Sequence, residues 1–453
     1  MKTEPLKQDT GRQRKNKWKA ILALALPAIG ETFFQSMVGF VDTFFVSKLG
    51  LVEVAAVGVT NAILQIYFSV FMALGVASTV MIANQVGEGN IPRARHIAKQ
   101  SILLAGWIGL FFGIITFIFA SPILKMMGAA EIVLEPAVIY FRTVATPSIF
   151  ISLMFILGSV LRGAGDTKSP MKVSLWINLL HILLDYILIF GIAGFGALGL
   201  LGAGLATVIV RLLGTILLWR ALTKYPVGAF SLSGWKIDKE IIKKFLKLGG
   251  PAAGERLSMR IGQVIYFGMI LRMGTYTYAA HQLAGNFTIF GYMAGYGLAT
   301  AATTLVGQSL GAKKHDEARE YAKASTFIGM FLLTGIGIMV YVLLPWVIPY
   351  FTVDTAVINQ VRIALGIDVF NQVALAVVLI LTGVLQAGGD TKYPMYTTTI
   401  GIWAFRTFGV YLLGVYLGWG LAGVWIAIGL DNGLRAILLY LRFRSNRWIQ
   451  ISG

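Results

Sequence analysis

Six acidic side chains lie within long apolar stretches of the sequence, where a charged group is costly unless it has a partner or a task. They are Glu31, Asp42, Asp185, Glu255, Asp368 and Asp431. Burial disfavours the charged form of a carboxyl group, and a second carboxylate nearby disfavours it further. Such a group can take up a proton on one side of a barrier and release it on the other. These residues therefore point to proton or cation binding.

Four side chains form a candidate proton-coupling set. Asp42 and Asp185 fall at similar depths in two stretches that we expect to run in the same direction, so they can meet. His181 is four residues before Asp185 and shares its helix face. Glu31 precedes Asp42 by eleven residues, which at about 100° per residue returns it to nearly the same face. The alternative is a buried polar set that only fixes helix packing, and for His181 and Glu31 that interpretation is favoured.

The elements that must position these acids are membrane-spanning helices. Only 13% of the 453 residues are charged, against about 25% in ordinary soluble proteins. Apolar runs of about 20 residues can cross a bilayer as helices, and we predict an all-α integral membrane protein with twelve of them. The predicted spans are 20–47, 52–85, 97–124, 132–161, 171–193, 198–222, 249–271, 276–307, 321–349, 357–385, 394–417 and 421–441.

The distribution of basic residues orients these spans. The formal charge is +18, and most of it falls in alternate connections and at the two ends, which is typical of cytoplasmic segments. Lys48, Lys125 and Arg272 are the exceptions on the opposite side. We therefore expect both termini in the cytoplasm of a bacterial inner membrane, an uncleaved first span and no nucleic-acid partner. The chain has no cysteine, so disulfides and thiol sites are excluded.

An internal repeat divides the chain into two halves. Three stretches recur at an offset of 224 residues: the P-A-x-G-E motif at 27 and 251, the A-R motif at 94 and 318, and 161–171 against 385–395, which agree at seven of eleven positions. Even numbers of spans separate the copies, so the halves share one orientation. We predict a basic N-terminus (1–19), a six-helix bundle (20–223), a linker with a basic amphipathic helix (224–248) and a second bundle (249–453).

These motifs resemble the MATE (multidrug and toxic compound extrusion) transporters, in particular their DinF-like branch. The resemblance rests on LPAIGETFFQSMVGFVDTFFVSKLG in the first span, both G-D-T-K loops, LLDYILIFG and LGAGLAT. It implies a V-shaped pair of six-helix bundles that exports amphipathic cations in exchange for H⁺ or Na⁺. It also implies that acids at the positions of Asp42 and Asp185 couple transport to ions, whereas His181 stands where Asn is more usual.

Glu255 and Asp368 form an alternative cation site, as in family members thought to use Na⁺. Na⁺ needs several oxygen ligands and no competing cation. Four arginines share or neighbour these spans and can neutralise the acids as ion pairs, so we favour protons. They are Arg256, Arg260, Arg362 and Arg406. Asp431 and Arg211 occupy roughly corresponding places in the last span of each half, and we expect both to pack or to pair. Arg142 has no predicted place.

Aromatic and methionine side chains are suited to an apolar cleft for flat cations. The candidate lining residues, each of which could instead face lipid or core, are Phe34, Met37, Phe150, Met154, Met259, Tyr266, Met293 and Tyr296. The G-D-T-K loops are predicted to be turns that cap the following helices. No nucleophile, catalytic set or metal-ligand set emerges, so we expect no enzyme and no cofactor beyond the coupling ion. We predict a monomeric proton-coupled exporter, with a Na⁺-coupled exporter or a lipid or lipid-linked precursor flippase as alternatives.

Overall fold

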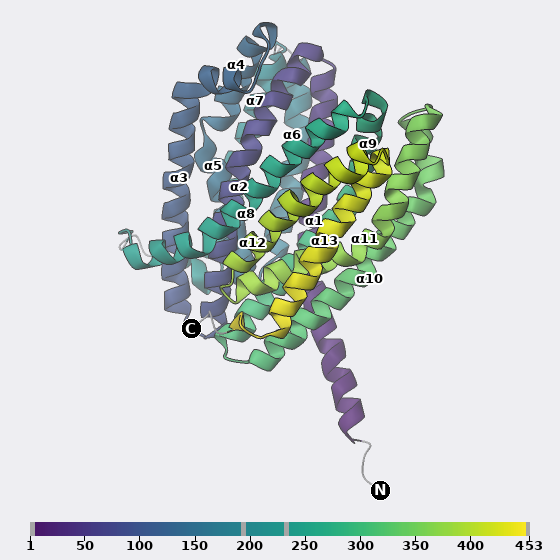
Figure 1. Cartoon of the computed structure of the whole chain (residues 1–453). Helices are drawn as coiled ribbons and strands as arrows, with labels where there is room; N and C mark the ends of the chain where they lie inside the picture. Colours follow the sequence, from purple (N-terminus) through teal and green to yellow (C-terminus); the bar gives the residue numbers. More distant parts are fainter. Residues whose placement is uncertain (1–4, 192–195, 231–234, 450–453) are drawn as a thin grey trace. The chain divides into compact units, whose positions relative to one another are not determined.

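The chain was examined as a computed structural model, which describes residues 5–191, 196–230 and 235–449 and, within them, the side chains from residue 16 onward. All regular structure in these ranges is helical (Figure 1). The predicted N-terminus and linker are therefore described only in part.

The first half of the chain contains seven α-helices among the described residues. Their bounds are α1 (Pro5–Ser47), α2 (Leu51–Gly87), α3 (Ile91–Met126), α4 (Glu131–Ala145), α5 (Ser148–Gly163), α6 (Lys168–Phe190) and α7 (Gly199–Thr223). The second half contains six more, with two π-helical stretches that continue α12. Their bounds are α8 (Lys239–Arg272), α9 (Thr275–Gly311), α10 (His315–Val347), α11 (Thr355–Ala387), α12 (Lys392–Ile400), η3 (Gly401–Thr407), η4 (Val410–Tyr416) and α13 (Gly420–Arg444).

Ten helices in the described ranges are long and apolar enough to cross a membrane, or eleven with the bent pair α4 and α5. The predicted span 249–271 lies in α8, where Glu255, Arg256 and Arg260 lower its apolar character. The predicted span 132–161 is not one straight helix, because α4 and α5 meet at an angle of 45°. Pro147 lies at this break and cannot donate the backbone hydrogen bond that a continuous helix needs. Its counterpart in the repeat, Asn371, lies inside the unbroken α11.

The helices form two compact units. The N-terminal unit contains Gly30–Ala253, and the C-terminal unit contains Met1–Ile29 and Gly254–Gly453. Both boundaries fall inside a helix, α1 and α8, and they lie 224 residues apart, which is the offset of the sequence repeat. The units therefore follow the repeat, with one exception at each boundary. The first part of α1 belongs to the C-terminal unit, and the first part of α8 belongs to the N-terminal unit.

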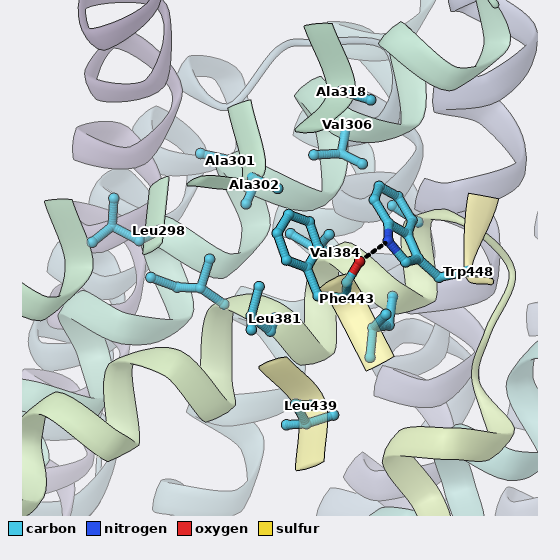
Figure 2. Packing of buried hydrophobic residues seen from close by; sticks show 14 of the residues in the cluster. Leu298, Ala301, Ala302, Val306, Ala318, Leu381, Val384, Leu439, Phe443 and Trp448 are labelled. Carbon is cyan, nitrogen blue, oxygen red and sulfur yellow. Dashed lines mark hydrogen bonds between the residues drawn. The ribbon is translucent and has the colours of Figure 1, made fainter. Parts of the chain in front are cut away.

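The first parts of α1 and α8 pack into corresponding hydrophobic cores of the two units. Ile21 of α1 packs into the C-terminal core with Leu298 and Ala301, part of which is drawn in Figure 2. Its counterpart Phe245 of α8 packs into the N-terminal core, which includes Leu74 and Ala77. Phe245 is fully buried there. The predicted amphipathic linker helix is thus the beginning of α8 rather than a separate helix, and part of its apolar face is covered by protein.

Candidate functional site

The helix that carries Asp185 and His181 begins at the first G-D-T-K loop. Asp166 accepts hydrogen bonds from the backbone nitrogens of Lys168 and Ser169, both at 3.0 Å. These contacts satisfy donors that the first turn of α6 would otherwise leave free. The capping role predicted for this loop is therefore present. In the second loop Asp390 is also held by an ion pair with Arg442 at 2.7 Å.

Asp42 and Asp185 come close enough in the N-terminal unit to interact electrostatically. Asp185 is completely buried, and neither of its carboxylate oxygens has a hydrogen-bond partner among the described residues. Nε2 of His181, one helical turn away, lies 3.5 Å from its Oδ2. Asp42 is half-buried, and its Oδ1 also lacks a hydrogen-bond partner in the described part of the chain. The structure thus brings together three members of the predicted coupling set.

Side chains from α4 and α7 complete this acidic cluster. Arg211 of α7 interacts electrostatically with Asp42 and with Tyr140 of α4, while its Nη1 donates to the backbone oxygen of Val144 at 3.2 Å. The hydroxyl of Thr207 lies 3.2 Å from His181 Nε2. Arg211, which the sequence assigned only to packing or pairing, is therefore part of the cluster. Arg142 is not, since it is exposed with its guanidinium 5.8 Å from the Phe117 ring.

Sequence reasoning missed Tyr140 and Thr207 and did not connect Arg211 with the acids of this cluster. The repeat contains one signal that would have helped, since Arg211 corresponds to Arg435 at the 224-residue offset. Tyr140 corresponds to Ala364, so the repeat gives no indication of it. An uncharged tyrosine in an apolar helix is also too common to stand out.

Glu31 belongs to a different contact. Nη1 of Arg162 donates to both carboxylate oxygens of Glu31 at 3.0 Å. In the C-terminal unit, Gln386 Nε2 donates to Glu255 at 3.3 Å from the same position of the repeat. Glu31 is thereby neutralised by an arginine, which favours its packing role, whereas the direct partner of Glu255 at this position is an amide.

A continuous polar network links the acids of the C-terminal unit. Asp368 accepts hydrogen bonds from Asn371 and Gln372. Asn432 donates to Asn371 at 3.0 Å and accepts from Arg406 at 3.2 Å.

The same network extends to Asp431 and Glu255. Asp431 pairs with Arg406 at 2.7 Å and with Arg435 at 3.0 Å. Arg435 also reaches Thr398 at 3.4 Å, and Thr398 donates to Glu255 at 3.0 Å. Asp431 thus pairs, as predicted.

The predicted roles of the C-terminal arginines change accordingly. Arg406 binds Asp431 rather than Glu255 or Asp368, and Arg435, which was not singled out, shares that role. Arg256 interacts electrostatically with Glu255. Arg260 is exposed and donates to Gln263 at 3.1 Å. Arg362 is also exposed, and no ion pair joins it to Asp368.

The predicted substrate-lining residues differ in exposure. Met37 is 45% exposed, and Phe34, Phe150, Met154, Met259 and Tyr296 are half-buried. Tyr266 and Met293 are buried at 4% and 7% exposure. Tyr266 packs edge-to-face on Phe267 and faces the guanidinium of Arg406. Its position favours the packing alternative, while the accessible side chains keep the capacity to contact a ligand.

The repeat of six-span halves with buried acids is matched by a known family. The model described as MatE matches residues 27–187 and 251–412, which are the corresponding parts of the two halves. The chain belongs to the MatE family. Members of this family are membrane transporters and not enzymes, which confirms the predicted family and that part of the functional prediction. No finding distinguishes the DinF-like branch, which stays a prediction.

Relatives match over almost the whole length of this MatE protein. The transporter YisQ of Bacillus subtilis, itself described as uncharacterized, is 29% identical and is covered over 99% of both chains. A probable multidrug resistance protein, NorM of Thermotoga maritima, is 30% identical over 95% of this chain and 93% of its own. A MOP superfamily transporter from Pyrococcus furiosus superposes with a TM-score of 0.88 at 23% identity, covering 96% of this chain and 97% of that one. The last comparison confirms the predicted all-helical transporter fold.

Proposed function

We propose that the chain is a multidrug exporter that moves organic cations out of a bacterial cell in exchange for protons bound at Asp42 and Asp185. The name of the Thermotoga maritima relative supports multidrug export. The excess of basic residues in alternate connections supports cytoplasmic termini. The observation that carries proton coupling is the pair of acids with unsatisfied carboxylate oxygens in the N-terminal unit.

Two features of this pair favour a proton over a sodium ion. The closest group to Asp185 is the imidazole of His181, which offers Na⁺ no oxygen ligand, while Asp42 and Tyr140 also interact with this carboxylate. Arg211 opposes any added positive charge at Asp42, but a proton needs only one carboxylate oxygen and can be shared between two carboxylates, whereas Na⁺ needs several ligands. Proton binding removes the charge whose burial is costly. Proton release restores it and can be coupled to cation binding.

Transport into inside-out vesicles tests this proposal. Ethidium uptake would be measured with a pH gradient and a Na⁺ gradient imposed separately, for the wild type, Asp42→Asn and Asp185→Asn. The matched control is Asp316→Asn, which alters an exposed acid. We expect the pH gradient alone to drive uptake, both buried variants to fall to background and the control to retain wild-type rates. Uptake driven only by Na⁺, with Asp42→Asn active, would contradict the proposal.

A Na⁺-coupled exporter is the second candidate because of one feature of the C-terminal network. Gln372 Oε1 is buried beside Asp368 and has no hydrogen-bond partner among the described residues. A carboxylate and a free amide oxygen are suitable Na⁺ ligands, although Asn371 and Gln372 already donate to Asp368. In that case Asp368→Asn and Glu255→Gln would lose Na⁺-driven uptake. Phospholipid scrambling without ethidium transport would instead support the flippase alternative.

A further inference from the structure

An apolar groove with one arginine lies on the surface of the C-terminal unit, between α10 and α11. Its volume is about 410 Å³, and its lining residues are Tyr341, Arg362, Ile363, Gly366, Ile367 and Phe370. The lining contains one cation and no acid. Arg362 makes no hydrogen bond or ion pair with any other residue in the described ranges. A guanidinium within a membrane-spanning helix is costly without an anionic partner.

The groove faces away from the polar network of the same unit. Phe370 follows Asp368 by two residues, which places it about 200° around α11. Asp368 is buried, whereas Phe370 is 84% exposed and Ile363 is 50% exposed. Apolar side chains of α10 continue this surface, including Ile338 and Val342 at 49% and 53% exposure. This is the composition of a surface in contact with lipid tails.

The arginine lies near one end of these helices. Arg362 follows the first residue of α11 by seven positions, or about 10 Å. Tyr341 precedes the last residue of α10 by six positions, or about 9 Å, so the two side chains lie at similar depth. Trp346 and Tyr350, at 65% and 88% exposure, follow on the same end, where aromatic residues mark the boundary between acyl chains and headgroups.

A glycine forms the floor of the groove. A Cβ atom added to Gly366 would lie 3.4 Å from the ring of Tyr341, and its three nearest neighbours all belong to that side chain. A larger side chain at position 366 would occupy the groove without colliding with backbone. The groove thus offers apolar surface beside Arg362 that one acyl chain can cover.

We propose that this groove binds one anionic phospholipid, with its phosphate on Arg362 and the Tyr341 hydroxyl and an acyl chain along Ile363, Ile367 and Phe370. Charge complementarity selects the anionic class, because a zwitterionic headgroup brings an ammonium group for which the lining has no acid. The site does not depend on the transported substrate or the coupling ion. With the termini in the cytoplasm, as proposed above, the lipid belongs to the outer leaflet.

Native mass spectrometry of the detergent-purified full chain tests the site. Phosphatidylglycerol and phosphatidylethanolamine of equal chain length would be titrated in parallel against the wild type, Arg362→Gln and Gly366→Leu. Arg272→Gln is the matched control, since Arg272 is exposed at the end of α8. We expect the apparent affinity for the first phosphatidylglycerol to fall about tenfold in Arg362→Gln, because this variant loses one charge-assisted contact with the phosphate.

The same experiment has clear contrary outcomes. Gly366→Leu should also lose phosphatidylglycerol while keeping the wild-type melting temperature, and Arg272→Gln should bind as the wild type does. Equal loss in Arg362→Gln and Arg272→Gln would mean that surface charge alone attracts the lipid, which overturns the site. Binding of phosphatidylethanolamine with the same affinity and the same sensitivity to Arg362→Gln would overturn the anionic selection.

Discussion

Equivalent glutamates of the repeat have different partners in the two units. Glu31 has the guanidinium of Arg162, and Glu255 has the amide of Gln386 together with the hydroxyl of Thr398. An arginine that donates directly to a carboxylate favours its charged form. The direct donors to Glu255 are neutral, and the positive charges that interact with it are those of Arg256 and Arg435. The contacts therefore favour the predicted structural role for Glu31, while Glu255 belongs to the polar network of the C-terminal unit.

Changing Arg162 tests the structural role of Glu31. Arg162→Gln copies the contact that the C-terminal unit already makes, whereas Arg162→Met leaves a buried carboxylate without its donor. Such a loss costs about 2–3 kcal/mol. We expect Arg162→Met to lower the apparent melting temperature in detergent clearly and Arg162→Gln to lower it less. Arg220→Met, on the exposed face of α7, is the control. Equal melting temperatures for all three variants would remove the structural role.

The acidic cluster could be predicted only where charge made its members conspicuous. Asp42, Asp185 and His181 were found because ionisable residues are rare in apolar helices and because four residues make one helical turn. Tyr140 and Thr207 carry no such signal, and their role depends on how α7 packs against α4 and α6. Arg406 was found by the same signal but Arg435 was not, and the partner of neither could be predicted, because pairing depends on side-chain direction across helices.

The break between α4 and α5 is supported by a neighbouring helix. Gly109 and Gly113 lie one turn apart on α3, and both face the break. A Cβ atom at Gly109 would lie 2.6 Å from the Cα of Ile149, and one at Gly113 would collide with the backbone oxygen of Thr146. The bend and the two glycines are thus one packing arrangement. Hydropathy could not predict it, because the apolar run continues across Pro147.

Substitution of these glycines separates close packing from helix propensity. Gly113→Ala should destabilise the protein, because backbone must move to admit the methyl group, and loss of folded protein on heating in fluorescence-detected gel filtration would measure it. Gly106→Ala, on the same helix, has nothing within 4 Å of the added atom. There alanine should be neutral or stabilising by up to about 1 kcal/mol. Equal behaviour of the two variants would argue against a tight contact at the break.

The repeat allowed the organisation of the whole molecule to be predicted, except where its two units divide. The sequence places the division in the connection around residues 224–248, whereas the contacts divide the chain inside α1 and α8. The P-A-x-G-E motifs lie at both boundaries, at the 224-residue offset. Hydropathy identifies membrane spans but does not reveal which bundle covers the first turns of a helix, since that depends on tertiary packing of residues such as Ile21 and Phe245.

The connection between the halves is fastened to the N-terminal unit by polar contacts. Gln100 of α3 donates to the backbone oxygen of Lys236 at 2.7 Å and accepts from the backbone nitrogen of Asp238 at 3.0 Å. His96 lies 3.0 Å from the carboxylate of Asp238. Arg95 donates to the backbone oxygen of Pro226 from two nitrogens. The described part of the linker is thus a docked segment rather than a free tether.

The acid in this docked segment makes its attachment dependent on pH. Hydrogen bonding to His96, together with that from the backbone nitrogens of Ile241 and Glu240, lowers the pKa of Asp238 below its ordinary value of 3.8. The charged form is therefore favoured by docking, so this contribution is fully present above the ordinary pKa and is lost as the pH falls below it. Charged neighbours around the contact are Arg93, Glu240 and Lys244.

Limited digestion with pepsin, which is active across this pH range, measures the attachment. Above pH 4, we expect the linker of the wild type to be cut more slowly than that of Asp238→Asn. The two rates should converge as the pH falls below 3.8, because protonation then removes the charge that the substitution removes permanently. Taking the ratio of the two rates at each pH cancels the pH dependence of pepsin itself. Asp316→Asn, which removes an exposed acid outside the linker, should keep the wild-type rate throughout. A constant ratio between the wild type and Asp238→Asn would show that the carboxylate does not hold the linker.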